Sequence, residues 1–134
     1  MKALTVKQPY ATAIVRGLKT VENRSQRWAY RGPLAIHAGK AWSNHGAESV
    51  ASISGRCFIY APQSAIIGLV DLVDVHEDAG CCLPWGMPGR FHLVLDNPRS
   101  LDVPVPCAGR LGLWNLPLEI AELLAPIDAQ AVTE

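Results

Sequence analysis

The stretch KQPYATAIVRGLKTVENR, residues 7–24, gathers mixed charge beside an apolar segment. Its first part predicts a short helix, because Pro9 suits the first helical turn and Gly17 suits the position just past a helix end. Its second part, LKTVENR, alternates like a strand, so Glu22 and Arg24 share one face. Such a helix typically plugs one side of a small barrel, and the charges that follow it are expected at the barrel mouth.

Charge is scarce elsewhere in the 134-residue chain, which is 18% charged and 49% hydrophobic. This composition argues against disorder, and the length fits one domain at 1–134, with a core at 3–117 and a C-terminal helix and tail at 118–134. Residues 1–40 hold eight Lys or Arg and one acid, whereas the rest holds four and eleven. Either one face is basic and meets a polyanion, or folding brings the two halves together and cancels the field.

The chain has no apolar run close to the roughly 18 to 20 residues that a membrane span needs. Its first ten residues, MKALTVKQPY, have no long apolar stretch after the lysine, so we do not expect them to act as a signal peptide. We therefore expect a soluble, cytoplasmic protein without a membrane partner.

Apolar alternation predicts further strands. Leu34, Ile36 and Ala38 share a face in YRGPLAIHAG, and Gly68 inside AIIGLVDLVDVHED (65–78) predicts a bulge or bend. Other strands are expected at 2–7, 90–99, 101–109 and 110–117, and helices at 44–54 (capped by Ser43 or Asn44 and ended by Gly55) and at 117–124, before a frayed tail at 125–134. About six strands with two or three short helices predict an α+β, mainly β fold, as a small curled sheet or barrel.

Three charged residues, Lys19, Glu22 and Arg24, are the first candidates for chemistry. Lys19 points away from the other two unless a bulge turns it. A carboxylate that accepts and a guanidinium that donates in a fork are able to read a polar ligand jointly, or they form a surface ion pair of little consequence. In a hydrolase, Lys19 with a lowered pKa would be a general base, Glu22 an acid or base, and Arg24 the group that stabilises a developing anion.

The cysteines, Cys57, Cys81, Cys82 and Cys107, form no C-x-x-C pair. The adjacent pair is poor geometry for a shared zinc, and the histidines at 45, 76 and 92 are scattered, without the spacing of a metal site. We expect reduced thiols, no metal site and no cofactor.

Aromatic and basic side chains are candidate ligand contacts. Tyr10, or one of the tryptophans Trp42, Trp85 and Trp114, would stack on a base. Alternatively, these rings fill the core. His37 and Lys40 lie on the strand after Arg24, where a lone histidine is more often structural.

Four segments, taken in their order along the chain, resemble the ASCH domain family, which is similar in fold to PUA RNA-binding domains. The segments are LTVKQPYATAIVRGLKTVENR, YRGPLAIHAGK, IIGLVDLVDV and FHLVLDNPRSLDVPVPCAGRLGLWNL. The motif residues are Gln8-Pro9-Tyr10, Gly17, Lys19, Glu22, Arg24, Arg31-Gly32 and Ile36-His37-Ala38. The resemblance implies a small PUA-like β-barrel whose cleft binds RNA or a nucleotide-like small molecule. The predicted catalytic residues are Lys19, Glu22 and Arg24, and the predicted substrate-binding residues are Gln8, Pro9, Tyr10, Arg31, His37 and Lys40.

Functions within the family are mixed, and they include a hydrolytic branch that removes the acetyl group of N4-acetylcytidine. That branch uses a lysine, a threonine two residues before the motif arginine, and a distant glutamate. Lys19 matches the lysine, but Glu22 stands at the threonine position, so a threonine nucleophile is not carried over. Three functions stay open: an RNA- or nucleoside-binding domain, a metal-independent hydrolase (a ribonuclease or a nucleoside amidohydrolase), and a protein-interaction barrel.

Overall fold

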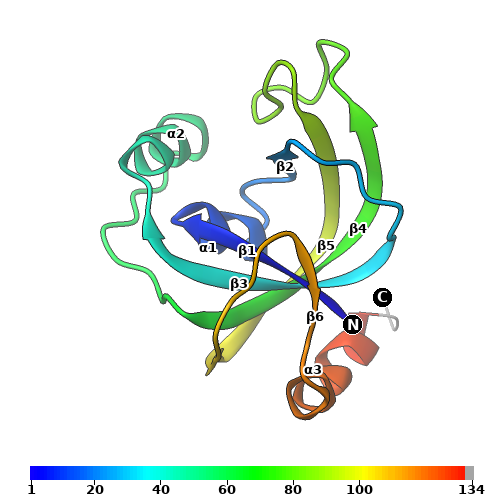
Figure 1. The fold of residues 1–134 in the computed structure, drawn as a ribbon. Coiled ribbons are helices and arrows are strands. Elements are labelled where there is room, and N and C mark those ends of the chain that lie inside the picture. The colour runs from blue at the N-terminus through cyan, green and yellow to red at the C-terminus, as the bar shows by residue number, and fades with distance from the viewer. Residues whose placement is uncertain (132–134) are drawn as a thin grey trace.

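A single curled sheet of six strands surrounds a short helix in the computed structural model, which describes residues 1–131 (Figure 1). The strand order is β2-β5-β4-β3-β1-β6, and only the β1–β3 pair is parallel. The elements are β1 (Lys2–Gln8), α1 (Tyr10–Val15), β2 (Val21–Arg24), β3 (Gly32–Trp42), α2 (Asn44–Ser54), β4 (Ala65–Glu77), β5 (Phe91–Pro106), β6 (Leu113–Asn115) and α3 (Leu118–Ala131). The predicted mainly β, α+β fold is confirmed, although the sheet stays open, since β2 and β6 do not pair with each other within the described residues.

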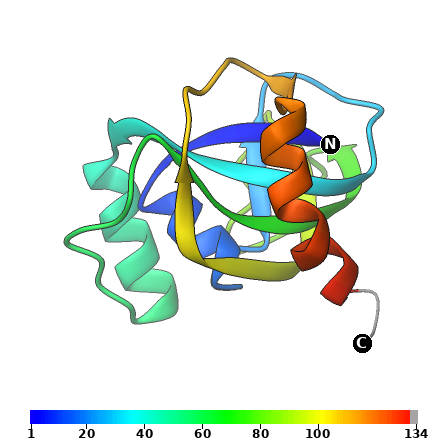
Figure 2. The ribbon, with the colours of Figure 1, turned by 90° about the horizontal axis from the view of Figure 1, so that it is seen from below.

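The sheet is buried on both faces because its strands alternate between two apolar clusters. Leu34, Ile36 and Ala38 belong to the inner cluster, whereas Ala35 belongs to the outer one, which confirms the predicted alternation. The outer face is covered by α3, whose Leu124 is fully buried (Figure 2).

The concave side of the sheet holds α1, as predicted. Ala11, Ile14 and Val15 are buried in the inner cluster with side chains of β1, β3, β4 and β5. The helix ends at Val15, and Gly17 follows with a φ of 77°. The chain then turns directly into the segment that leads to β2, so the charged residues after α1 lie at one end of the inner core.

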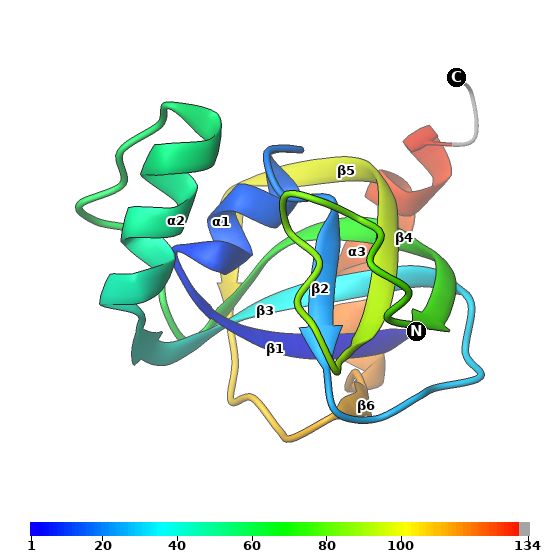
Figure 3. The same cartoon turned by 90° about the horizontal axis from the view of Figure 1, so that it is seen from above.

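The predicted helix at 44–54 coincides with α2. Ser43 accepts a hydrogen bond from the backbone N–H of Gly46 at 2.8 Å, and Gly55 ends the helix with a φ of 74°. Val50 packs with Ala13 of α1, so α2 stands beside α1 at the open side of the sheet (Figure 3).

The predicted irregularity at Gly68 is confirmed. The pairing of β4 with β5 shifts register between Ile66 and Gly68. A Cβ atom on Gly68 would lie 2.6 Å from Cγ1 of Val15 and 2.7 Å from the carbonyl oxygen of Arg99. Glycine at this position therefore allows α1 to approach the sheet closely.

Two elements are longer than expected. β5 joins the predicted strands at 90–99 and 101–109, because the ladder shifts register between Asp96 and Arg99 and leaves Pro98 out of the pairing. α3 continues to Ala131, so the expected fraying is wrong for residues 125–131, and residues 132–134 lie outside the described part. Within residues 1–131, no helix has the length and apolar character to cross a bilayer.

We predict that Gly68→Ala lowers the free energy of unfolding by about 1–3 kcal/mol, because the added methyl group overpacks the contact between α1 and the sheet. Urea denaturation measures the change. Gly55→Asn is the control, since nothing lies within 4 Å of that position and asparagine tolerates its positive φ. A Gly68→Ala variant as stable as the parent would contradict the proposed close approach.

Candidate functional site

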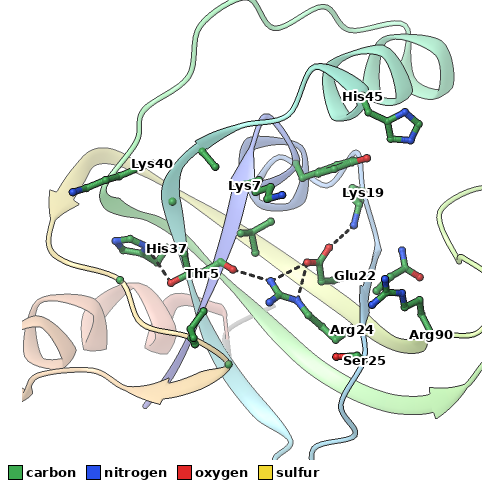
Figure 4. Close-up of a pocket in the computed structure, with 18 of the residues that line it drawn as sticks. Thr5, Lys7, Lys19, Glu22, Arg24, Ser25, His37, Lys40, His45 and Arg90 are labelled. Carbon is green, nitrogen blue, oxygen red and sulfur yellow. Dashed lines mark hydrogen bonds and ion pairs between the residues drawn. The ribbon is translucent and has the colours of Figure 1, made fainter.

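A cavity of about 980 Å³ opens beside α1, between β1, β2, β3, α2 and two loops, 78–90 and 107–112 (Figure 4). Its lining includes one acid, Glu22, against six basic residues: Lys7, Lys19, Arg24, Lys40, Arg90 and Arg110. Apolar side chains complete the lining, among them Val6, Ile53, Met87 and Leu111. The cavity is therefore cationic and partly apolar, which suits an anionic ligand that also carries an apolar surface.

Lys19, Glu22 and Arg24 form an ion network in this cavity. The Lys19 Nζ donates to Glu22 Oε1 at 2.8 Å and also to the carbonyl oxygen of Val21. Arg24 donates from Nε to Glu22 Oε2 at 3.1 Å and from Nη2 to the carbonyl oxygen of Thr5 at 2.7 Å, and its Nη2 forms an ion pair with Glu22 Oε2 at 3.0 Å. The three charges meet in a recessed site beside α1, with Lys19 turned toward Glu22, and their chemical roles stay predictions.

Lys19 joins the network because it precedes β2, so strand alternation does not govern where its side chain points. The backbone N–H groups of Leu18 and Lys19 both donate to the carbonyl oxygen of Ala13, which folds this segment back on α1. The Lys19 ammonium lies 5.1 Å from the centre of the Tyr10 ring and 5.8 Å from that of Trp85. Two aromatic faces and two oxygen acceptors thus hold a cation that is only 3% exposed.

Glu22 is 8% exposed and would be costly to bury alone. Burial by itself raises the pKa of Glu22, but the charges and hydrogen bonds of Lys19 and Arg24 outweigh it and hold the pKa below its ordinary value of 4.5. The carboxylate is therefore ionised at neutral pH. It contributes stability that is present above pH 4.5 and is lost as the pH falls through the lowered pKa of the folded state.

The 78–90 loop forms one wall of the cavity and is anchored to β2. Asn23 donates from Nδ2 to the carbonyl oxygen of Trp85 at 2.9 Å and accepts from the N–H of Met87 at 2.8 Å. The indole N–H of Trp85 donates to the carbonyl oxygen of Leu18 at 3.1 Å. These contacts place Trp85 against Lys19, and they identify Trp85, rather than Trp42 or Trp114, as the tryptophan that lines the cavity.

His37 lines the cavity but has both ring nitrogens engaged. Its Nε2 lies 2.8 Å from the carbonyl oxygen of Cys107, and its Nδ1 lies 3.3 Å from Oγ1 of Thr5, which also accepts from the indole N–H of Trp114. His37 is 2% exposed, so it positions Thr5 and the 107–112 loop more than it offers a surface to a ligand.

The other predicted binding residues divide into two groups. Tyr10 and Lys40 line the cavity, whereas Gln8, Pro9 and Arg31 do not. Gln8 is fully buried and joins α1 to the loop before β4, by accepting from the N–H of Thr12 and donating to the carbonyl oxygen of Pro62. Pro9 is buried at the start of α1.

Arg31 lies outside the cavity because its guanidinium binds nearby backbone. It donates to the carbonyl oxygens of Trp28 and Tyr30, at 2.9 Å each, and lies 3.8 Å from the carboxylate of Asp74. Arg90 and Arg110 also line the cavity but were not among the predicted site residues. Each was expected at the first position of a strand, at 90–99 and 110–117, and the structure places both on loops, where strand alternation does not determine which way a side chain points.

The expectation that the histidines at 76 and 92 are scattered is wrong, because these two residues lie close to each other and to Cys81 and Cys82. One ligand atom from each of these four residues lies within 4.8 Å of all the others. His76 and His92 are direct partners in the β4–β5 ladder, and Cys82 adopts a φ of 64°, in the left-handed region of the backbone. A prediction that β4 pairs with β5 in this register would have placed His76 beside His92 and so indicated the cluster.

We predict that Glu22→Gln lowers the free energy of unfolding at neutral pH by roughly 3 kcal/mol, because it leaves two cations in the network without their counter-charge. The variant should also lose part of the acid dependence of the parent below pH 4.5, since a group with a lowered pKa in the folded state is removed. Thermal or urea unfolding between pH 3 and pH 7 measures both effects, with the exposed Glu48→Gln as control. If the free energy of unfolding fell equally with decreasing pH in Glu22→Gln and in the parent, this result would argue against a buried, ionised Glu22.

Comparisons with known proteins address the fold and the family. The ASCH domain family matches residues 4–100 of the chain. Activating signal cointegrator 1 of Mus musculus and that of Homo sapiens are each 28% identical over an alignment of 130 residues, which covers 87% of this chain and 22% of the relative. The chain thus spans about a fifth of the length of these curated relatives.

Solved structures support the same assignment at the level of the fold. The crystal structure of ASCH from Zymomonas mobilis has a TM-score of 0.59 at 17% identity, with 93% of each chain covered. A mutant of ZmASCH has a TM-score of 0.61 at 15% identity, covering 93% of this chain and 96% of the other. The family match over most of the chain and the shared architecture show that this chain belongs to the ASCH domain family.

Proposed function

We propose that this chain binds RNA or a nucleotide-like molecule in the cavity. The observation that carries the proposal is the make-up of the lining: six basic residues against one acid, with apolar side chains between them. Its volume, about 980 Å³, is at the upper end of the range of small-molecule sites and accommodates a nucleotide. The family's similarity in fold to PUA RNA-binding domains supports the same class of ligand.

The basic residues fall into two groups with different tasks. Lys19 and Arg24 are held by Glu22, whereas Lys7, Lys40, Arg90 and Arg110 are exposed and take part in no ion pair within residues 1–131. In Figure 4, Lys40 and Arg90 lie on opposite sides of the ion network. The exposed group is suited to phosphates, because an unpaired cation gains most from an incoming anion.

The ion network is suited to a polar base edge. Arg24 donates from Nε to Glu22 and from Nη2 to Thr5, whereas its Nη1 donates no hydrogen bond within the described residues. A guanidinium held on one side and open on the other presents a donor in a fixed orientation. Tyr10 borders the same space, so a base that meets Arg24 comes close to an aromatic ring.

We predict that Lys7→Ala/Lys40→Ala weakens binding of a short single-stranded RNA and reduces the salt dependence of the affinity. Each lost phosphate contact lowers the slope of log K against log salt by about 0.7, so the double variant should lose about 1.4. Fluorescence anisotropy at several salt concentrations gives the slope. Arg56→Ala is the matched control, because Arg56 is exposed and lies outside the cavity.

A parent protein whose RNA affinity does not change between low and high salt would contradict phosphate contacts as the source of binding. A double variant with the parent slope would place the RNA away from Lys7 and Lys40. An equal loss in Arg56→Ala would show attraction by overall charge instead of a site.

A second candidate function is metal-independent hydrolysis of RNA or of a nucleoside amide. One observation favours it: a carboxylate that is ionised at neutral pH lies between two cations at the edge of a cavity. Glu22 would take a proton from the attacking hydroxyl or water, and Arg24 would stabilise the anion that develops.

Measuring whether the chain converts a substrate distinguishes binding from hydrolysis. Hydrolysis predicts that the chain cleaves an RNA oligonucleotide or deacetylates N4-acetylcytidine, and that Lys19→Met abolishes the reaction by disturbing Glu22. Chromatography of the products measures the rate. Parent protein that binds RNA without converting either substrate would reject hydrolysis and leave the binding function.

A further inference from the structure

A cluster of four potential metal ligands lies behind the cavity wall, where β4 and β5 are joined by the 78–90 loop. The cluster consists of His76 at the end of β4, Cys81 and Cys82 in the loop, and His92 at the start of β5. None of the four lines the cavity, and neither proposed function uses them.

All four ligand atoms lie within 4.8 Å of one another, and three of their separations match those of a tetrahedral zinc site. The two sulfur atoms lie 3.7 Å apart, Cys82 Sγ lies 3.4 Å from His76 Nε2, and Cys81 Sγ lies 3.8 Å from His92 Nδ1. With Zn–S near 2.3 Å and Zn–N near 2.0–2.1 Å, tetrahedral ligands stand roughly 3.3–3.8 Å from one another. Zn²⁺ favours this mixture of thiolate and imidazole ligands.

The second nitrogen of each histidine is engaged in the way metal-binding histidines require. His76 Nδ1 lies 2.8 Å from the carbonyl oxygen of Glu77, and His92 Nε2 lies 2.9 Å from that of Met87. A ring N–H that donates to a carbonyl leaves the lone pair on the opposite nitrogen, and that nitrogen faces a cysteine in both cases. His92 is fully buried, so its orientation is determined by packing.

The surrounding loop is built closely around the cluster. A Cβ atom on Gly86 would lie 2.7 Å from the carbonyl oxygen of Cys81, 2.8 Å from Cε1 of His92 and 2.9 Å from Cβ of Cys82. The N–H groups of Trp85 and Gly86 both donate to the carbonyl oxygen of Cys82, at 3.1 and 2.7 Å. The loop therefore wraps the four ligands tightly, with no room for a side chain at position 86.

We propose that His76, Cys81, Cys82 and His92 bind one Zn²⁺ ion, which orders the 78–90 loop. Four protein ligands complete a tetrahedral shell, so the ion is structural and leaves no position open for a substrate. The loop carries Trp85 and Met87 into the cavity wall, and the metal fixes that wall from behind. This inference stands independently of the proposed function, because it concerns ligands that do not touch the cavity.

Metal content of the purified chain is the first test. We expect about one Zn²⁺ per chain by mass spectrometry in untagged protein prepared with a reductant and without chelator, and the same content in Cys57→Ser, whose cysteine is exposed and outside the cluster. Cys81→Ser/Cys82→Ser should lose the metal. Retention of stoichiometric zinc by the double variant would overturn the assignment.

Cobalt titration tests the parent chain directly, so the result does not depend on whether a variant folds. Reduced, metal-free protein should bind one Co²⁺ with thiolate charge-transfer bands and the intense visible bands of tetrahedral cobalt, and Zn²⁺ should bleach them. Parent protein that takes up neither Zn²⁺ nor Co²⁺ with its thiols reduced would refute the site. An octahedral cobalt spectrum without charge-transfer bands would do the same.

Hydrogen exchange connects the metal to the loop. Removal of zinc by a chelator should speed exchange at the amides of Trp85, Gly86 and Met87 by tenfold or more, while the helix α3 exchanges as before. Equal protection of these amides with and without zinc would reject the ordering role. RNA affinity is measured separately on the same samples, so failure of the metal proposal and failure of the RNA proposal are distinguishable.

Discussion

The ion network of Lys19, Glu22 and Arg24 is the constraint on which the candidate site depends. Two of its members are almost completely removed from water in a chain that is only 18% charged. Such burial is unfavourable unless the charges satisfy one another, and here each Glu22 oxygen accepts from a different cation. Removing Glu22 leaves two cations without their counter-charge, and removing either cation leaves one Glu22 oxygen without its ion-pair partner, so the geometry of the arrangement is specific.

The network also determines how distant segments meet. Lys19 belongs to the turn after α1, Glu22 and Arg24 to an edge strand of four residues, and Thr5 to β1 on the other side of the curled sheet. The hydrogen bond from Arg24 to the Thr5 carbonyl oxygen spans a gap that no strand pairing closes. Side-chain charge thus connects the two sides of an open sheet, and the cavity lies beside that connection.

Local sequence determines much of this fold. Alternation along β3 predicted which residues enter each core, and Ser43 and Gly55 predicted the bounds of α2, because these signals act within a few residues. The position of Lys19 was not predictable from alternation, since it lies outside the strand. The length of β5 was also missed, because prolines end a strand only where their missing N–H is needed, and a shift in register removed that need at Pro98.

The site was predictable where it depends on the motif around α1 and not where it depends on loops. Lys19, Glu22 and Arg24 could be selected from sequence. Arg90 and the Cys/His cluster depend on how β4 pairs with β5 and on the path of the loop that connects them, and Arg110 depends on the path of the 107–112 loop between β5 and β6. Gln8 and Arg31 belong to the motif, yet they bind backbone carbonyl groups and support the fold. A motif residue can therefore support the fold around a cavity without lining it.

The 78–90 loop, which forms one wall of the cavity, and the ion network of Lys19, Glu22 and Arg24 stabilise each other. Trp85 reaches Lys19 only because Asn23 and Leu18 hold the 78–90 loop against β2. If that loop moved away, water would reach the Lys19 ammonium, and the attraction between Lys19 and Glu22 would weaken as the local dielectric rose. The loop excludes water from the Lys19–Glu22 ion pair, and the ion network holds in place the strand to which the loop is anchored. We therefore expect that loss of order in the loop and loss of order in the ion network occur together.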